Sequence, residues 1–192
     1  MASTAGDVSQ VWQTGSAAPV ALFICTNCAR EGRDARATQR DLRAGLCLDW
    51  PFAVDEMVVP CSGKIQPEHL LKAFEAGADL VCVVGCEQDN CHCLEGSRRA
   101  AQRVHYVREL LDEAGLGGER LLMFYLPGTA REDMAAAFSV QSGTDPGEAS
   151  RTRISSLLEG IRDEMIARLA SLRPSPLRGD SAARRASSME AE

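Results

Sequence analysis

The sequence has no long apolar run and few aromatic side chains, and each shortage excludes a class of protein. No stretch approaches the roughly 20 consecutive apolar residues that a membrane-spanning helix needs. Aromatic residues make up 5% of the 192 residues and the formal net charge is −6. A basic surface with interleaved aromatics is therefore missing, and nucleic-acid binding is not favoured. Because 45% of the residues are hydrophobic, we expect most of the chain to fold around a core, without membrane or nucleic-acid partners.

The chain also lacks the signals of export and of nucleotide binding. Its first residues, MASTAGDVSQVWQTGSAAP, have neither the basic nor the apolar region of a secretory signal. We therefore expect a cytoplasmic location, where thiols stay reduced. No Gly-x-Gly-x-x-Gly follows a predicted strand, and Lys64 is not part of a P-loop, because Val58 and Ile65 stand where that motif needs glycine and a hydroxyl.

Apolar runs alternate with helical patterns along the chain. Strands are expected at residues 19–25, 55–61, 79–85 and 120–126, and helices at 32–45, 67–76, from a Ser97 cap to Gly115, near 130–139 and over 152–172. Strands that alternate with helices form a parallel sheet covered on both faces. The expected fold class is therefore α/β, a three-layer flavodoxin-like or Rossmann-like sheet of four to five strands. The last helix has an amphipathic stripe, and packing on the sheet is favoured over a partner-facing role.

What the chain does have is eight cysteines, and without an export signal they indicate metal or redox chemistry. Three of them stand where a predicted strand ends, and two of these have close companions: Cys25 with Cys28, Cys61 alone, and Cys86 with Cys91 and Cys93. The carboxyl ends of parallel strands share one edge of the sheet, where ligands bind. Six thiols can therefore converge there, and soft sulfur ligands in that number select iron–sulfur clusters or zinc.

Two other cysteines and one histidine are not interpreted as ligands. Cys82 lies inside an apolar strand and is interpreted as a buried core residue. Cys47 lacks a partner at ligand spacing and is interpreted as a core or surface residue that binds no metal. His92 is interpreted as a neighbour of the site rather than a ligand, because residues 91 and 92 rarely both reach one small centre. Two alternatives to an iron–sulfur site stay open: a structural zinc module with four cysteines, and a thiol–disulfide oxidoreductase that uses the Cys25-x-x-Cys28 pair.

The motifs Pro-Cys61-Ser-Gly, Gly-Ala-Asp-Leu-Val-x-Val-x-Gly-Cys86 and Asn-Cys91-His resemble the delta subunit of methyl-viologen-reducing (F420-non-reducing) hydrogenase. The resemblance covers roughly residues 19–140 and includes the CxxC pair. It implies a [2Fe–2S] cluster and an electron relay between a hydrogenase- or dehydrogenase-type partner and a heterodisulfide-reductase-like flavin and iron–sulfur subunit. The ligand candidates that it implies are Cys25, Cys28, Cys61, Cys86 and Cys91. Four thiolates hold such a cluster, so one candidate is surplus.

This chain departs from the family pattern at two places. The family usually has Trp inside its CxxC and an aromatic residue shortly after, where this chain has Thr26-Asn27 and Ala29-Arg30. The family usually has an aromatic residue after Cys-His, where this chain has Cys93. Cys93 either replaces a ligand or remains a free thiol beside the cluster, and the sequence favours the free thiol.

These inferences define an expected organisation. Residues 1–18 form a flexible leader, 19–140 the iron–sulfur α/β domain, 141–173 a loop and the C-terminal amphipathic helix, and 174–192 a disordered tail. The chain is expected to be a non-catalytic subunit of an oxidoreductase, with its partner covering the edge of the sheet that carries the cysteines.

Overall fold

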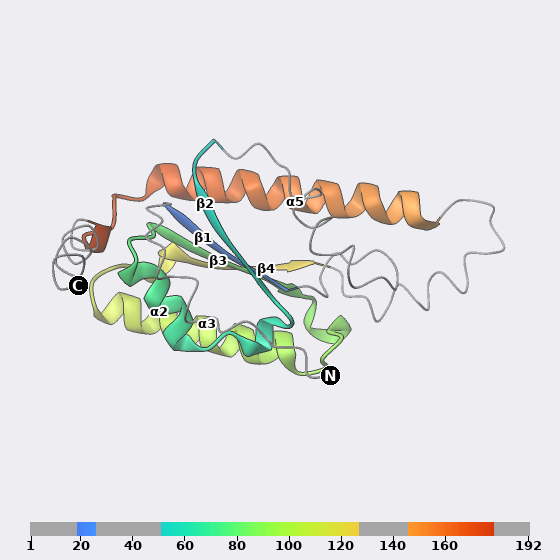
Figure 1. The fold of residues 1–192 in the computed structure, drawn as a ribbon, viewed down its shortest axis with the longest axis horizontal. Helices are drawn as coiled ribbons and strands as arrows, with labels where there is room; N and C mark the ends of the chain where they lie inside the picture. Colours follow the sequence, from blue (N-terminus) through green and yellow to red (C-terminus); the bar gives the residue numbers. More distant parts are fainter. Residues whose placement is uncertain (1–18, 26–50, 127–145, 179–192) are drawn as a thin grey trace, which may run out of the picture.

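A computed structural model describes residues 19–25, 51–126 and 146–178, with the backbone alone for 146–155. Its sheet contains four strands, β1 (Val20–Cys25), β2 (Val54–Val59), β3 (Leu80–Cys86) and β4 (Leu121–Leu126), in the order β2-β1-β3-β4 (Figure 1). Every neighbouring pair is parallel. This confirms the parallel α/β sheet predicted from the alternation of strands and helices. The expected leader and the predicted helices at 32–45 and 130–139 lie outside the described residues.

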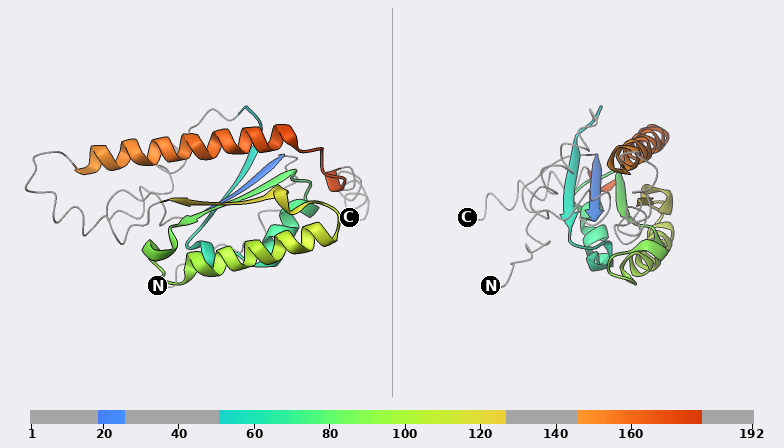
Figure 2. Two further views of the ribbon diagram at one scale, coloured as in Figure 1. Left: turned by 180° about the vertical axis from the view of Figure 1, so that it is seen from behind. Right: turned by 90° about the vertical axis from the view of Figure 1, so that its right-hand side faces the viewer.

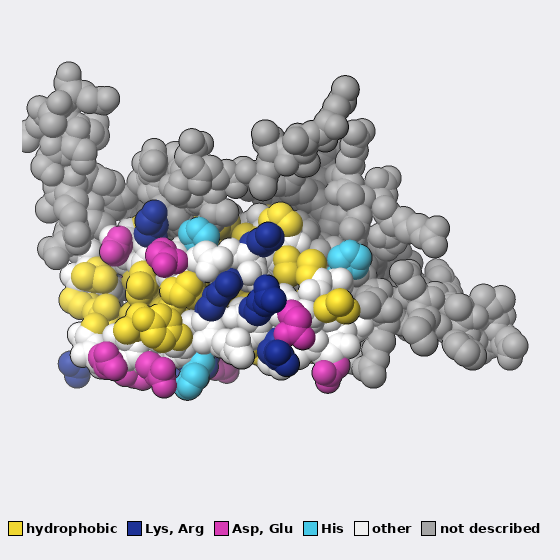
Figure 3. Space-filling model, turned by 90° about the horizontal axis from the view of Figure 1, so that it is seen from below, with side chains coloured by type: hydrophobic (Ala, Val, Ile, Leu, Met, Phe, Trp, Pro, Cys, Tyr) yellow, Lys and Arg dark blue, Asp and Glu magenta, His cyan; other side chains and the backbone are white. Residues whose placement is uncertain are grey.

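Helices cover both faces of the sheet, as the three-layer prediction requires. Helices α2 (Pro67–Glu75) and α3 (Gly96–Glu113) lie on one face, and α5 (Pro146–Ser171) crosses the other and extends past the carboxyl edge of the strands (Figures 1 and 2). None of the helices within the described residues has the length and apolar character needed to cross a membrane. Figure 3 views the α2–α3 face, on which basic side chains gather in the middle and hydrophobic ones at one end.

The core has two parts because successive strand side chains point to opposite faces. From β1, Leu22 and Ile24 join the cluster on the α5 side, whereas Phe23 joins the cluster under α2 and α3. The stripe on α5 buries three residues against the sheet: Leu158, Ile161 and Met165. The last helix therefore packs on the sheet, which is the favoured of its two interpretations.

Two element boundaries differ from the prediction. The last helix begins at Pro146, before the predicted range of 152–172, and proline is well tolerated in the first helical turn. Ser97 was expected to cap α3, but it lies inside the first turn, where its hydroxyl donates to the carbonyl of Cys86. A reciprocal cap is found instead at α2, where the Gln66 amide donates to Nδ1 of His69 at 2.9 Å.

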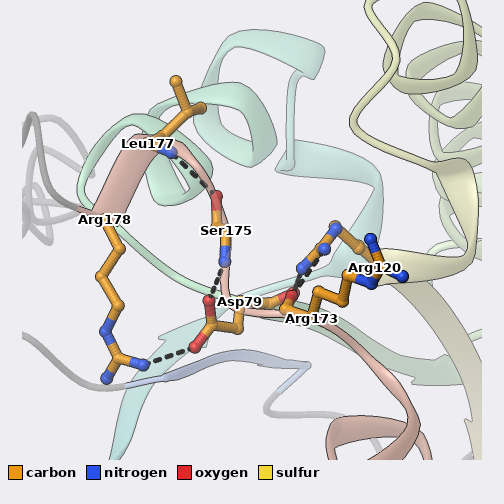
Figure 4. Close-up of polar contacts among 6 residues, drawn as sticks. All are labelled: Asp79, Arg120, Arg173, Ser175, Leu177 and Arg178. Atoms are coloured by element: carbon orange, nitrogen blue, oxygen red, sulfur yellow. Dashed lines mark hydrogen bonds and ion pairs between the residues drawn. The ribbon is translucent and has the colours of Figure 1, made fainter.

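A polar contact joins the segment after α5 to the amino edge of the sheet (Figure 4). Asp79 is 4% exposed, and its carboxylate accepts from the Ser175 amide at 2.5 Å and from Arg178 at 2.6 Å. Arg120 donates to the carbonyl oxygens of Asp79 at 3.1 Å and Arg173 at 2.7 Å. Residues 174–178, the start of the predicted disordered tail, are therefore held against the sheet.

Replacement of Asp79 by alanine should destabilise the fold. The buried Ser175 amide would lose its acceptor, and an unsatisfied buried donor costs about 1–3 kcal/mol. The free energy of unfolding, measured in urea, is expected to fall by this amount. Asp163→Ala is the matched control, because its carboxylate is 70% exposed and pairs with Arg162; loss of such a surface pair changes stability by less than about 1 kcal/mol. Equal effects of the two variants would contradict the role assigned to Asp79.

Candidate functional site

The order of the strands places two cysteine-bearing strand ends at the centre of the sheet. From β1 the chain moves to β2 on one side, whereas β3 and β4 follow on the other. The direction of winding therefore reverses between β1 and β3, the position where open α/β sheets bind ligands. Cys25 is the last residue of β1 and Cys86 the last residue of β3. Both are buried, so the thiols are enclosed at the carboxyl edge and not on the surface.

Cys61 joins this edge from the neighbouring strand. It follows β2 and precedes a short 3-10 turn, η2 (Ser62–Lys64), with 6% of its surface exposed. The Cys25 thiol lies 3.9 Å from the carbonyl oxygen of Pro60, the residue before Cys61. The end of β1 is thereby tied to the loop that carries the second cysteine.

The Cys61 loop is held against the beginning of α3. The guanidinium of Arg103 donates to the carbonyl oxygens of Gly63 and Ile65, both at 2.8 Å. A Cβ atom at position 63 would lie 2.7 Å from the Cα of Gly96, closer than real side chains come to backbone. Glycine at 63 therefore permits the contact, and Arg103 fixes the loop that carries the sulfur.

Gly96, the first residue of α3, is surrounded by sulfur-bearing side chains. A Cβ atom there would overlap the Cys61 sulfur, and it would lie 3.4 Å from the Cys91 sulfur and 3.3 Å from the Cβ of Cys93. Cysteines from two different loops therefore meet at this glycine. We call the set Cys25, Cys61, Cys91 and Cys93 the sulfur group.

The surroundings of Cys61 change the pKa of its thiol. Burial raises the pKa of the Cys61 thiol to about 12, a hydrogen bond from the Gly63 backbone opposes the rise, and Cys93 and Cys25 add to it. In the absence of a metal the thiol is therefore protonated at neutral pH. A metal that binds here must displace that proton. The amino end of the 18-residue helix α3 lies beside the thiols and favours negative charge on them.

The residue that follows Cys61 carries a buried polar atom. Ser62 is 0% exposed, and its hydroxyl has no hydrogen-bond partner within the described part of the chain. Buried hydroxyl groups usually have a partner. The Ser62 hydroxyl lies 3.1 Å from the point where a Cβ of Gly85, the residue before Cys86, would stand. A hydroxyl on the residue after Cys61 and near the end of β3 is a donor of the kind that thiolates and inorganic sulfides accept from, so the residues present fit an iron–sulfur group.

The structure brings together most, not all, of the cysteines singled out from sequence. Cys25, Cys86 and Cys91 belong to the same buried cluster on the α5 side, and Cys61 adjoins Cys25 and Cys91. Cys28 and Cys47 lie outside the described residues. Cys82 is fully buried in the middle of β3, as expected of a core residue, and burial raises the pKa of its thiol.

Among the residues that the structure describes, no three His, Cys, Asp or Glu side chains converge tightly enough to hold a single metal ion. A binuclear cluster takes its four thiolates as two pairs, one for each iron, and so does not need three side chains at one point. His92 is exposed, consistent with its interpretation as a neighbour. The prediction missed the structural roles of Gly96, Ser97 and Arg103; the only sequence signal was the Gly-Ser pair that follows the cysteine loop.

The fold and the site together define a class: a flavodoxin-like α/β protein with a cysteine-lined centre at the carboxyl edge of its sheet. A family model described as methyl-viologen-reducing hydrogenase, delta subunit, matches residues 20–141. The chain therefore belongs to the family of methyl-viologen-reducing hydrogenase delta subunits, which confirms the resemblance inferred from its cysteine motifs.

Individual relatives agree with this assignment. The iron–sulfur subunit of the F420-non-reducing hydrogenase vhu of Methanococcus maripaludis is 36% identical over 113 residues, which are 58% of this chain and 79% of the relative. Its counterpart from Methanocaldococcus jannaschii is 34% identical over 119 residues, 62% of this chain and 84% of the relative. One subunit of the ferredoxin:CoB-CoM heterodisulfide reductase of Methanosarcina mazei is 31% identical over 107 residues, 56% of this chain but 13% of that longer protein.

Proposed function

We propose that this chain is a cytoplasmic [2Fe–2S] electron-transfer subunit of an oxidoreductase complex. It relays electrons between a hydrogenase- or dehydrogenase-type partner and a heterodisulfide-reductase-like flavin and iron–sulfur subunit. The observation that carries the proposal is the meeting of Cys61, Cys91 and Cys93 at Gly96, the first two of them buried, in a chain whose relatives are named iron–sulfur subunits. Soft thiolates in this number are the ligands that iron–sulfur clusters use.

The candidate ligands are Cys25, Cys28, Cys61, Cys86 and Cys91, of which four thiolates suffice. When bound, the cluster accepts and releases one electron at a time. The protein supplies enclosure and hydrogen bonds: the Gly63 backbone faces the Cys61 sulfur, and the Ser62 hydroxyl has no other partner among the described residues. Donors to sulfur stabilise the more negative, reduced state and so raise the reduction potential.

The proposed partner follows from the way in which this domain occurs in relatives. The match to the heterodisulfide reductase protein covers 56% of this chain but 13% of the relative, so a similar domain is part of the same polypeptide as that reductase component. A domain found covalently joined to a reductase in one protein is a good candidate to bind a similar reductase when it is a separate chain. The contact should include the carboxyl edge of the sheet, since a relay must bring its centre near those of its partners.

Anaerobic purification followed by iron, sulfide and zinc analysis tests the proposal. About two iron atoms and two inorganic sulfides per chain are expected, with an EPR signal that appears on reduction. Zinc without visible absorbance would replace the proposal with a structural zinc module. Protein that stays free of metal and sulfide after reconstitution would contradict it as well, and disulfide exchange that depends on Cys25 and Cys28 would then favour the oxidoreductase alternative.

A further inference from the structure

We infer that Cys93 is itself an iron ligand of this centre, because its loop places it against Cys61 and Cys91 at Gly96. The inference rests on the proposed function and names a residue beyond the five ligand candidates. The sequence favoured a free thiol at this position, since Cys93 replaces an aromatic residue of the family pattern. The placement of its side chain leads to the opposite conclusion.

The geometry around Gly96 carries the argument. The Cβ of Cys93 lies 3.3 Å from the point where a Gly96 Cβ would stand, and the Cys91 sulfur lies 3.4 Å from the same point. The Cys61 sulfur is closer to that point than either. The Cys93 side chain forms a hydrogen bond with the Cys61 thiol, and its Cβ and the Cys91 sulfur lie near the same point.

The backbone of the loop explains how a residue with an exposed surface faces a buried centre. The Leu94 amide donates to the carbonyl of Cys91 at 2.9 Å, and the Glu95 amide donates to the carbonyl of Cys93 at 2.7 Å. Leu94 has a φ of 54°, a left-handed conformation that leucine rarely adopts. This turn reverses the chain immediately before α3 and keeps Cys91 and Cys93 beside its first residue.

If Cys93 is a ligand, the number of surplus candidates and the orientation of the centre both change. A cluster needs four thiolates, so with Cys93 among them at least two of the five other candidates are surplus. Cys93 is also the one exposed member of the sulfur group. The side of the cluster nearest to solvent is then the Cys93 side, and Leu94 beside it is 81% exposed.

Two measurements on the full chain, purified anaerobically and loaded with iron and sulfide, test the inference. Cys93→Ser should give a shifted EPR spectrum and visible absorption through an oxygen ligand, or at least a twofold loss of iron. Cys82→Ala is the control, because its sulfur is enclosed in the middle of β3, and it should keep the wild-type spectrum. Circular dichroism of both variants separates ligand loss from misfolding.

Alkylation gives a readout that needs no variant. Iodoacetamide should modify Cys93 at least tenfold more slowly in the loaded protein than in the metal-free protein, as followed by mass spectrometry. Equal rates in the two forms, or a Cys93→Ser protein with wild-type iron content and spectrum, would overturn the assignment while leaving the proposed function intact. A wild-type chain that binds no iron and sulfide would instead overturn the proposed function.

Discussion

Cys61→Ala protein, purified anaerobically, should contain less than half of the iron and sulfide of the wild type. Cys61 is the residue on which the sulfur group centres, because Cys25, Cys91 and Cys93 all adjoin it. Its loop is fixed by Arg103 and by close backbone contact with Gly96, so the Cys61 sulfur is held in one position. Iron and sulfide quantification, together with visible absorption, measures the loss.

Cys82→Ala is the matched control for this prediction. It removes one sulfur from the same sheet, but from the middle of β3, where the side chain is 0% exposed and belongs to the α5-side core. Removal of a buried sulfur costs stability, about 1 kcal/mol for a typical destabilising substitution, without removing a ligand. Full iron in the Cys61→Ala protein, or equal iron loss in both variants, would show that Cys61 is not a ligand of the cluster.

Gly96→Ala should disrupt the centre without removing any thiol. The added methyl group would overlap the Cys61 sulfur, and neither partner can yield easily. The sulfur is buried, and the start of α3 is held by backbone contact with Gly63. Overpacking of this kind costs about 1–3 kcal/mol. We expect a corresponding decrease in the free energy of unfolding and a lower yield of loaded protein.

Gly160→Ala is the comparison that makes the Gly96 result specific. Gly160 is exposed inside α5, and a Cβ there would meet nothing within 4 Å. Alanine is favoured over glycine in a helix by about 1 kcal/mol, so this variant should be slightly more stable and should load normally. Wild-type stability and iron content in the Gly96→Ala protein would contradict the close packing described for the sulfur group.

The exposed side chains near the centre suggest how the protein meets its partner. Leu94 is 81% exposed beside the cysteine loop, and Tyr125 is 38% exposed near the end of β4. The Tyr125 hydroxyl lies 3.4 Å from the side-chain amide of Gln88, which belongs to the same loop region as the cysteines. Isolated surface hydrophobes need no explanation, but these two lie at the edge of the sheet where the proposed function requires a partner to bind.

Much of the local structure was determined by the sequence alone. Apolar runs predicted the four described strands to within about two residues, the usual uncertainty of element boundaries. The signal is clearest for β1 and β3, which are buried along their whole length, because strands buried on both faces leave no polar alternation. Pro67 marked the start of α2 correctly. The cysteines at the ends of the apolar runs predicted a thiol-rich carboxyl edge, because all strands of a parallel sheet end on the same side.

The tertiary structure alone decided which thiols meet and what holds them together. Cys61 touches Cys93 because Arg103 and the Gly63–Gly96 contact bring the loop after β2 against the start of α3, and no local pattern encodes a contact between segments so far apart in the chain. For the same reason the Ser97 hydroxyl donates to the carbonyl oxygen of Cys86 and does not cap its own helix. Sequence periodicity sets the direction of each side chain within its element, whereas distances between elements follow from packing of the whole core.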